Sequence, residues 1–249
     1  MPRQMISDHQ WSKLAPILGM QRVHISPETR SFIEAVLWKL RCGAPWRELA
    51  ECFGPYSTIL SRFNRWSKKA RWSSIFYALS FDADNEWNSM DATIVKAHQH
   101  STGAAGKNDE GIGKSVAGNT SKIHMLCDAH GNPIDFVITG GQVYDSKVAG
   151  SLIEVCEAEN LMADKAYHSS LIRQQCFEKG IQPIIPIKKN TVDKTNLGFD
   201  SHLYKQRHVV ENLFARLKHF RSIATRFDKS LVNYSSVIFL ACAYIWSKF

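Results

Sequence analysis

The sequence predicts an α/β fold in which a mixed β-sheet flanked by helices follows an all-helical N-terminal segment. In the first eighty residues, apolar side chains recur at helical spacing. Residues 87–98 then alternate apolar and polar side chains as a half-buried strand does, and predicted strands and helices alternate after them. With 249 residues, 44% of them hydrophobic, the chain can bury one substantial core and a small extra domain. We therefore expect two domains, at residues 1–80 and 81–249.

The N-terminal segment is expected to form a helix-turn-helix. Ser26 stands before a proline and a glutamate, which is the pattern of a helix N-terminus, and Gly43 ends that helix. A short helix is expected at 45–52 and a third at 58–70, with Ser57 as its cap. The third helix is the candidate for DNA recognition because it carries four cations, Arg62, Arg65, Lys68 and Lys69. The alternative is a three-helix bundle with a solvated basic face.

Charge is unevenly distributed along the chain. Residues 1–80 hold 12 Lys and Arg against 5 Asp and Glu, and residues 202–249 hold 8 against 2. The part between them has a net charge of −5, although the whole chain has +8. Basic flanks around an acidic centre are typical of a protein that grips a polyanion.

The predicted sheet begins at residues 87–98, where Asp91 is the single acid. A hairpin is expected next, with strands at 122–128 and 133–139 and a His-Gly-Asn turn between them. The elements after it are a helix at 146–157, a strand ending at Asp164, a helix at 171–179 and a strand at 183–187. A hairpin followed by α/β crossovers is the element order of an RNase H-like fold. An acid at the end of a buried strand faces the rim of the sheet, where ligands bind in α/β folds.

Four polar residues near the C-terminus share helical spacing: Tyr204, Arg207, Glu211 and Lys218. At about 100° per residue they leave a helix within a sector of about 60°. Apolar residues lie on roughly the opposite face: Val209, Val210, Leu213, Leu217 and Phe220. One face therefore packs, and the other holds an acid beside an aromatic hydroxyl and two cations. The alternative is a surface helix in which Arg207 and Glu211 form an ordinary ion pair.

The spacing Tyr-x2-Arg-x3-Glu-x6-Lys resembles the signature around the third catalytic acid of bacterial insertion-sequence transposases of the DDE type, in the IS-five group. Further segments resemble the same group: 90–100 with Asp91, 121–124, 139–145, 163–167 with Asp164, and the N-terminal stretches 42–49 and 62–66. The chain departs from the group at Ala166 and His168, where Gly and Asp are common.

The resemblance implies an enzyme that cleaves DNA at the ends of an insertion sequence and transfers those strands into target DNA. Its catalytic acids would be Asp91, Asp164 and Glu211, which would hold two Mg²⁺ ions, replaceable by Mn²⁺. Tyr204, Arg207 and Lys218 would support the DNA phosphate. The implied partners are double-stranded DNA, as terminal inverted repeats and as target, and further copies of the chain, at least a dimer on paired ends.

Other classes of function are disfavoured. The six cysteines form no Cys-x-x-Cys pair, so a zinc site is not expected. We expect reduced thiols in the core of a cytoplasmic protein. No signal segment is expected, and the apolar run 237–246 is too short to span a membrane. Gly113-Lys-Ser115 is not expected to bind a nucleotide, because Asn108 stands where a phosphate loop needs glycine.

Two other functions remain open on the sequence. A metal-dependent nuclease would share the acids but would cut without joining. A DNA-binding regulator derived from a transposase would keep residues 1–80 without needing all three acids, and their joint presence argues against it.

Overall fold

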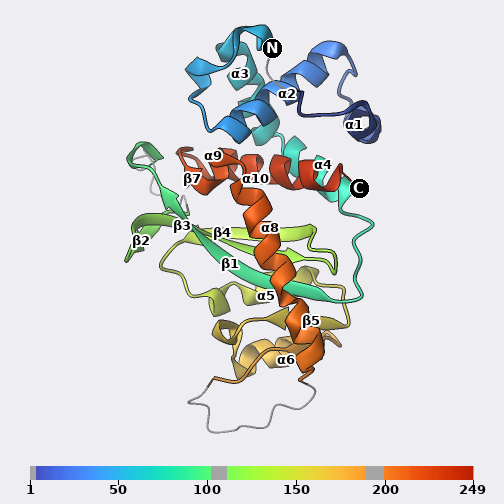
Figure 1. Ribbon diagram of the computed structural model, residues 1–249, viewed down its shortest axis with the longest axis vertical. Coiled ribbons are helices and arrows are strands. Elements are labelled where there is room, and N and C mark those ends of the chain that lie inside the picture. The colour runs from blue at the N-terminus through green and yellow to red at the C-terminus, as the bar shows by residue number, and fades with distance from the viewer. Residues whose placement is uncertain (1–3, 102–110, 189–198, 249) are drawn as a thin grey trace. The chain divides into compact units, whose positions relative to one another are not determined.

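The computed structural model describes residues 4–101, 111–188 and 199–248 (Figure 1). By packing, the chain divides into two compact units. The helical unit comprises Met1–Phe81, Ala97–Asn108 and Leu217–Phe249, and the sheet unit comprises Asp82–Lys96 and Asp109–Arg216. The C-terminal residues are therefore grouped with the N-terminal helices. The domain boundary expected between residues 80 and 81 stays a prediction.

In the helical unit, the helix-end signals expected at Ser26 and Gly43 form caps, and Ser7 supplies a cap that was not predicted. Ser7 and Gln10 make a capping box on the first helix, and the Ser26 hydroxyl accepts from the Thr29 amide on the second. Gly43 ends the second helix with a φ of 69°. The elements are α1 (Asp8–Met20), α2 (Pro27–Cys42), α3 (Tyr56–Lys68), α4 (Arg71–Leu79), α9 (Arg221–Ala224), β7 (Thr225–Arg226) and α10 (Leu231–Trp246).

Two expectations for this unit were wrong in detail. The helix expected at 45–52 is two 3₁₀ turns, η1 (Trp46–Glu48) and η2 (Glu51–Phe53). The backbone is extended at Leu49 and Ala50, which separates the two turns, and η2 ends at Gly54, where φ is 83°. Helix α3 begins earlier than expected, after Pro55 and without a side-chain cap, so Ser57 lies inside the helix.

Aromatic rings fill the core of the helical unit. The rings of Phe32 and Trp66 are 5.0 Å apart, and those of Trp66 and Trp72 are 4.9 Å apart, which joins α2, α3 and α4. Helix α10 completes this core, because Phe239 lies 5.6 Å from Phe76 on α4. A fragment that ends at residue 80 would therefore expose apolar surface that α10 normally covers.

The sheet unit has the expected mixed sheet. Its strands are β1 (Asn88–Ala97), β2 (Gly113–Ser115), β3 (Gly118–Cys127), β4 (Pro133–Gly140), β5 (Asn160–Ala163) and β6 (Gln182–Ile184). Strand β3 pairs antiparallel with β1 on one side and with β4 and β2 on the other. Strands β5 and β6 continue the sheet beyond β1 in parallel. An antiparallel hairpin followed by parallel crossovers confirms the RNase H-like order.

Helices cover the sheet and hold a continuous core. Helices α5 (Ala149–Val155) and α6 (Ser170–Glu178) pack on one face, where Met90 of β1 and Leu126 of β3 join Leu152 and Cys176. Helix α8 (His208–Lys218) crosses in front of the sheet in Figure 1, whereas α5 lies behind it. Short 3₁₀ turns η3 (Gln99–Ser101), η4 (Asp145–Lys147) and η5 (Lys165–Tyr167) complete the connections.

The helix expected to carry Tyr204, Arg207, Glu211 and Lys218 is not continuous. Tyr204 ends α7 (Ser201–Tyr204), Arg207 ends the 3₁₀ turn η6 (Lys205–Arg207), and α8 begins at His208. A 3₁₀ turn advances about 120° per residue, so the sector calculated for an α-helix does not apply across η6. Only Glu211 and Lys218 lie on α8 itself.

The Gly113-Lys-Ser115 segment, which was considered above as a phosphate loop, is a strand. Gly113-Lys-Ser115 forms β2, which pairs with β3, whereas the lysine and serine of a phosphate loop lead into a helix. Asn108 lies outside the described residues.

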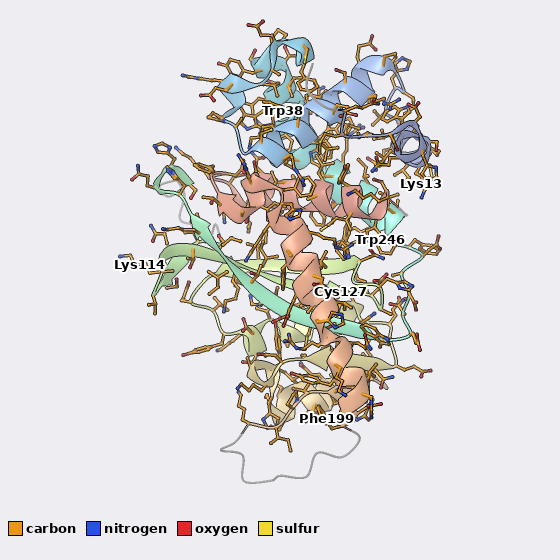
Figure 2. The ribbon with its side chains drawn as sticks, in the orientation of Figure 1. Lys13, Trp38, Lys114, Cys127, Phe199 and Trp246 are labelled. Carbon is orange, nitrogen blue, oxygen red and sulfur yellow. The ribbon has the colours of Figure 1, made fainter. Side chains whose placement is uncertain are left out.

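The cysteines differ in their exposure to solvent. Four cysteines are buried, among them Cys127 on β3, which is labelled in Figure 2. Cys42 and Cys52 are exposed, so the expectation of core thiols was wrong for these two. Among the helices of the described ranges, none combines the length and the apolar character needed to cross a bilayer.

Candidate active site

Asp91 and Asp164 are brought together by the register of two neighbouring parallel strands. Met90 pairs with Ala163 across β1 and β5, and each aspartate is the next residue along its chain. Because parallel partners share a register, the two carboxylates start from adjacent positions, at the point where β5 ends beside β1. Asp164 also begins the turn η5, where its Oδ1 accepts from the Ala166 amide at 2.7 Å.

Arg207 links Asp91 to the third predicted acid. Its Nη1 donates to Asp91 Oδ2 at 2.9 Å, and its Nη2 donates to Glu211 in a short contact. The Arg207 and Asp91 side chains are 20% and 21% exposed, whereas Glu211 is 55% exposed. One guanidinium thus neutralises two of the three acids, and the inner pair is largely sheltered from water.

Two partners of Asp91 stabilise its ionised carboxylate and so counteract the effect of burial on its pKa. Burial raises the pKa of this carboxyl most, and the neighbouring Asp164 raises it further. The Ala92 amide, which donates to Oδ1 at 2.8 Å, and the Arg207 guanidinium both lower the pKa, and the net direction is upward. Loss of either partner would therefore favour the protonated form of Asp91.

The other two residues of the predicted stripe lie on different elements. Tyr204 is next to Arg207 in space, with the guanidinium carbon 6.0 Å from the ring centroid. Lys218 is the exposed last residue of α8, two turns beyond Glu211. The structure therefore brings four residues into contact: Tyr204, Arg207, Asp91 and Glu211. Lys218 is related to them here only by its position on α8.

The donor set suits a hard divalent cation. All three side chains offer carboxylate oxygens, which Mg²⁺ and Mn²⁺ prefer over nitrogen or sulfur. Within the described ranges, however, no three His, Cys, Asp or Glu side chains converge closely enough to hold an ion. The Arg207 guanidinium contacts both Asp91 and Glu211 in this arrangement. The residues fit a metal provided that Arg207 moves aside.

A buried polar cluster beside the acids was not predicted. Lys122 Nζ donates to Asp145 Oδ1 at 3.0 Å, and His124 Nδ1 lies 3.7 Å from the same oxygen. His124 Nε2 is 2.9 Å from Thr139 Oγ1. Burial lowers the pKa of His124 to about 4, so the ring is neutral at neutral pH. The segments 121–124 and 139–145 had been noticed only for their resemblance to a family, and only the pairing of β3 with β4 joins them.

The four cations predicted on α3 differ in their surroundings. The Arg62 guanidinium lies 4.4 Å from the Phe32 ring centroid and donates to Thr29 Oγ1 at 2.8 Å. It is thus used in the packing of the helical unit. Arg65, Lys68 and Lys69 are exposed.

Comparisons with known proteins agree with this arrangement. Residues 87–246 match the family model described as "Transposase DDE domain", and residues 6–76 match a model for proteins assigned as transposases of the IS4/5 family. No solved structure matches the chain.

Relatives align with parts of the chain. A protein of Brucella ovis assigned as the transposase of insertion sequence element IS6501 is 34% identical over 52% of this chain and 99% of its own length. One of Burkholderia cepacia, assigned to element IS402, is 30% identical over 50% of this chain and 62% of its own length. An uncharacterised protein of Sinorhizobium fredii is 36% identical over 40% of this chain and 82% of its own length. The match over residues 87–246 covers the sheet and all three acids, and the chain therefore belongs to the DDE-domain family of insertion-sequence transposases.

Proposed function

We propose that the chain cuts DNA at the ends of an insertion sequence and joins those ends to target DNA, using divalent metal held by Asp91, Asp164 and Glu211. The observation that carries the proposal is the adjacency of Asp91 and Asp164 on β1 and β5, with Glu211 joined to Asp91 through Arg207. Membership in the DDE family supports a DNA cleavage and transfer enzyme.

Two Mg²⁺ ions are the proposed cofactors. Asp91, Asp164 and Glu211 would together hold the two ions. When bound, the ions activate the attacking oxygen and stabilise the leaving oxygen of a phosphodiester. The attacking oxygen belongs to water in the cleavage step and to the freed 3′-hydroxyl of the element in the joining step.

The protein's own side chains position the DNA. Arg207 has to leave its carboxylate partners when metal binds, and its guanidinium is then available to the scissile phosphate. Tyr204, beside that guanidinium, would support the same phosphate. Lys218 at the end of α8 remains a candidate on the sequence pattern.

The helical unit is the proposed site of end recognition. The exposed cations of α3, Arg65, Lys68 and Lys69, supply the charge that DNA phosphates attract, whereas Arg62 would act mainly by holding α3 against α2. Terminal inverted repeats come in pairs, so at least two copies of the chain would act on paired ends. The proposed location is the bacterial cytoplasm, where that DNA lies.

A strand-transfer assay tests the proposal. The substrate is a labelled duplex made from the DNA that flanks the reading frame, with a supercoiled plasmid as target. We expect nicking at the element's end and joined product in Mg²⁺ or Mn²⁺, and assembly with little chemistry in Ca²⁺. Cutting without joining would support the nuclease, and binding without cutting would support the regulator.

Oligomeric state is tested on the same duplex. Light scattering of the purified complex should give a mass of at least two chains and two DNA ends. A monomer that joins ends at full rate would contradict the paired-end proposal.

A further inference from the structure

The turn between β3 and β4, residues 128–132, lies against the helix that carries Glu211. Arg216 of α8 donates through Nη2 to the Gly131 carbonyl of this turn in a short contact. A methyl group on Gly131 would lie 3.0 Å from the Val209 carbonyl oxygen and 3.2 Å from the Val209 Cβ, closer than a side-chain carbon normally approaches. Val209 and Arg216 are about two helical turns apart, on the same side of α8. The β3–β4 turn therefore meets α8 at two points along its length.

The β3–β4 turn is held in one shape by its own hydrogen bonds. Gly131 has a φ of 73°, a left-handed conformation that glycine adopts without strain. The buried Asp128 carboxylate accepts from the His130 amide at 3.0 Å and from the Asn132 amide at 2.7 Å. It also accepts from the Asn132 side chain at 3.2 Å, and the Asp128 amide donates to the Asn132 carbonyl at 2.9 Å. A turn bonded in this way can act as a fixed support.

The same turn is also fixed relative to β1, which carries Asp91. It follows β3 directly, and Met125 of β3 pairs with Asp91 across the sheet. The Ala129 amide donates to the Asp84 carbonyl at 3.2 Å, and His130 Nε2 lies 3.1 Å from Asp84 Oδ2. Asp84 belongs to the segment that leads into β1. The turn thus binds both the approach to β1 and the helix α8.

Two links therefore join the strand of Asp91 to the helix of Glu211. One is the Arg207 guanidinium, which binds both acids. The other is the β3–β4 turn, whose contact at Val209 is about 200° around the helix from Glu211. Under the proposed function Arg207 leaves the acids when metal binds, whereas the contact at the turn stays in place.

The contact at the turn restrains α8 in a way that apolar packing does not. Val210 and Leu213 are buried, but hydrophobic attraction has no preferred direction, so it resists small shifts of a helix weakly. A hydrogen bond to Arg216 and a close approach to the Val209 backbone depend steeply on distance. They therefore set the position of α8 along its own axis.

We propose that the β3–β4 turn holds α8 at the level where Glu211 and Asp91 can bind the same partner, and that Gly131 and Arg216 are positioning residues for the metal-binding acids. This inference rests on the proposed function, because it assumes that Glu211 and Asp91 are ligands. Ligands must be held within about 0.5 Å of their working positions, so a small shift of α8 would weaken metal binding.

Gly131→Ala tests the close approach. Its methyl group would push α8 away from the turn and would also strain the left-handed backbone. Calorimetry on the full-length chain, without DNA, measures Mn²⁺ binding, and thermal melting measures stability. We expect Mn²⁺ to bind about tenfold more weakly, as changes around the ligands of a metal site typically cause. The melting temperature should also fall.

Gly180→Ala is the matched control. Gly180 precedes β6 and has a φ of 75°, so alanine strains its backbone to a similar degree. Apart from its chain neighbours, no atom of the described residues lies within 4 Å of the added methyl group. This variant should melt at a lower temperature and bind Mn²⁺ as the wild type does.

Two variants of Arg216 test the same contact without straining the turn. Arg216→Ala removes the donor to the Gly131 carbonyl and should weaken Mn²⁺ binding, as Gly131→Ala does. Arg216→Lys keeps a flexible cationic donor and should recover most of the lost affinity. If Arg216→Lys binds Mn²⁺ as weakly as Arg216→Ala, the hydrogen bond to the turn is not what positions α8.

Each contrary result has a distinct meaning. Wild-type Mn²⁺ affinity in both Gly131→Ala and Arg216→Ala would overturn the inference, and so would equal losses in Gly131→Ala and Gly180→Ala. Asp91→Asn and Glu211→Gln separate it from the proposed function. If both bind Mn²⁺ like the wild type, the ligand assignment itself is wrong. If both lose affinity while the variants of the turn contact keep it, only the positioning role fails.

Discussion

Arg207 is ion-paired to Asp91, 116 positions earlier in the chain, with Nη1 lying 2.9 Å from Oδ2. The same guanidinium also binds Glu211, so a single positive charge stands between two of the proposed metal ligands. Clustered carboxylates repel one another, and the Arg207 guanidinium relieves that repulsion between Asp91 and Glu211. Metal binding and the release of Arg207 toward DNA would then be coupled.

The three acids should be individually essential for chemistry. Asp91→Asn, Asp164→Asn and Glu211→Gln each remove a charged oxygen ligand, so cleavage and joining should fall below detection while binding to the element's end is kept. Gel-based cleavage and mobility-shift assays measure the two properties. Asp82→Asn, at an exposed acid of the sheet unit, is the control and should remain active. Robust joining by any one of the three would remove that residue from the ligand set.

Arg207 should matter far more for activity than for stability. The exposed pair with Glu211 contributes about 1 kcal/mol or less to folding, and the sheltered Asp91 can take up a proton once Arg207 is gone, so Arg207→Ala should melt only modestly below the wild-type temperature. Cleavage should fall about a hundredfold, equivalent to about 2.7 kcal/mol of transition-state stabilisation. Lys205→Ala, at an exposed cation of the same turn, is the control. If cleavage falls only in step with melting, Arg207 has a structural role alone.

His124 should make the fold less stable in mild acid. Its pKa is about 4 in the folded chain and 6.5 in the unfolded chain, so the unfolded state binds the proton first as pH falls. The contribution to stability is present above pH 6.5 and is lost between pH 6.5 and 4, by roughly 3 kcal/mol in all.

Urea unfolding at pH 7 and pH 4.5 measures this loss. His124→Gln should show a smaller difference between the two pH values than the wild type, because the titrating group is gone. His9→Gln, at an exposed histidine, should keep the wild-type difference. Equal differences in all three chains would exclude His124 as the source.

The exposed cations of α3 should supply salt-dependent DNA affinity. In the full-length chain, Lys68→Ala or Lys69→Ala should weaken binding to all duplexes alike and make the affinity less steeply dependent on salt. Arg65→Ala would relax discrimination at one base pair if this side chain reads a base. Fluorescence anisotropy at several salt concentrations measures both effects. Salt slopes identical to the wild type would place the DNA contact elsewhere.

Arg62→Ala should behave differently from its neighbours. Its guanidinium packs on Phe32 and binds Thr29, so its loss should lower the melting temperature. The full chain is needed for these measurements, because α10 completes the core of the helical unit.

The local elements were largely predictable from the sequence. Local signals located several elements: the alternation around Asp91, the apolar run that ends at Asp164 and the cap at Ser26. Each of these signals depends only on residues that are close to one another in the sequence. They located β1, β5 and α2 to within a residue or two of their observed bounds. Where such signals conflicted, prediction failed: the chain between Pro45 and Gly54 became two 3₁₀ turns, and the helix before Glu211 was interrupted at η6.

The identity of the site residues came from the sequence, but their relationships did not. Asp91, Asp164 and Glu211 were recognisable by spacing and by the residues around them, because the chemistry constrains which side chains appear there. That Arg207 binds Asp91 as well as Glu211 depends on β1 and the turn η6 meeting in space, and no local pattern encodes such a contact.

The same distinction explains Tyr167, Asp145 and the C-terminal helix. Burial and pairing are set by all neighbours together, so Tyr167, whose hydroxyl has no hydrogen-bond partner among the described residues, looks like any other tyrosine in the sequence. The apolar run in α10 was recognised as too short to span a membrane, but it did not indicate which helices it packs against, since hydrophobic attraction is not directional. The sequence by itself determined the family, the acids and most elements; the tertiary structure decided which charges meet, which polar group lacks a partner and which helices share a core.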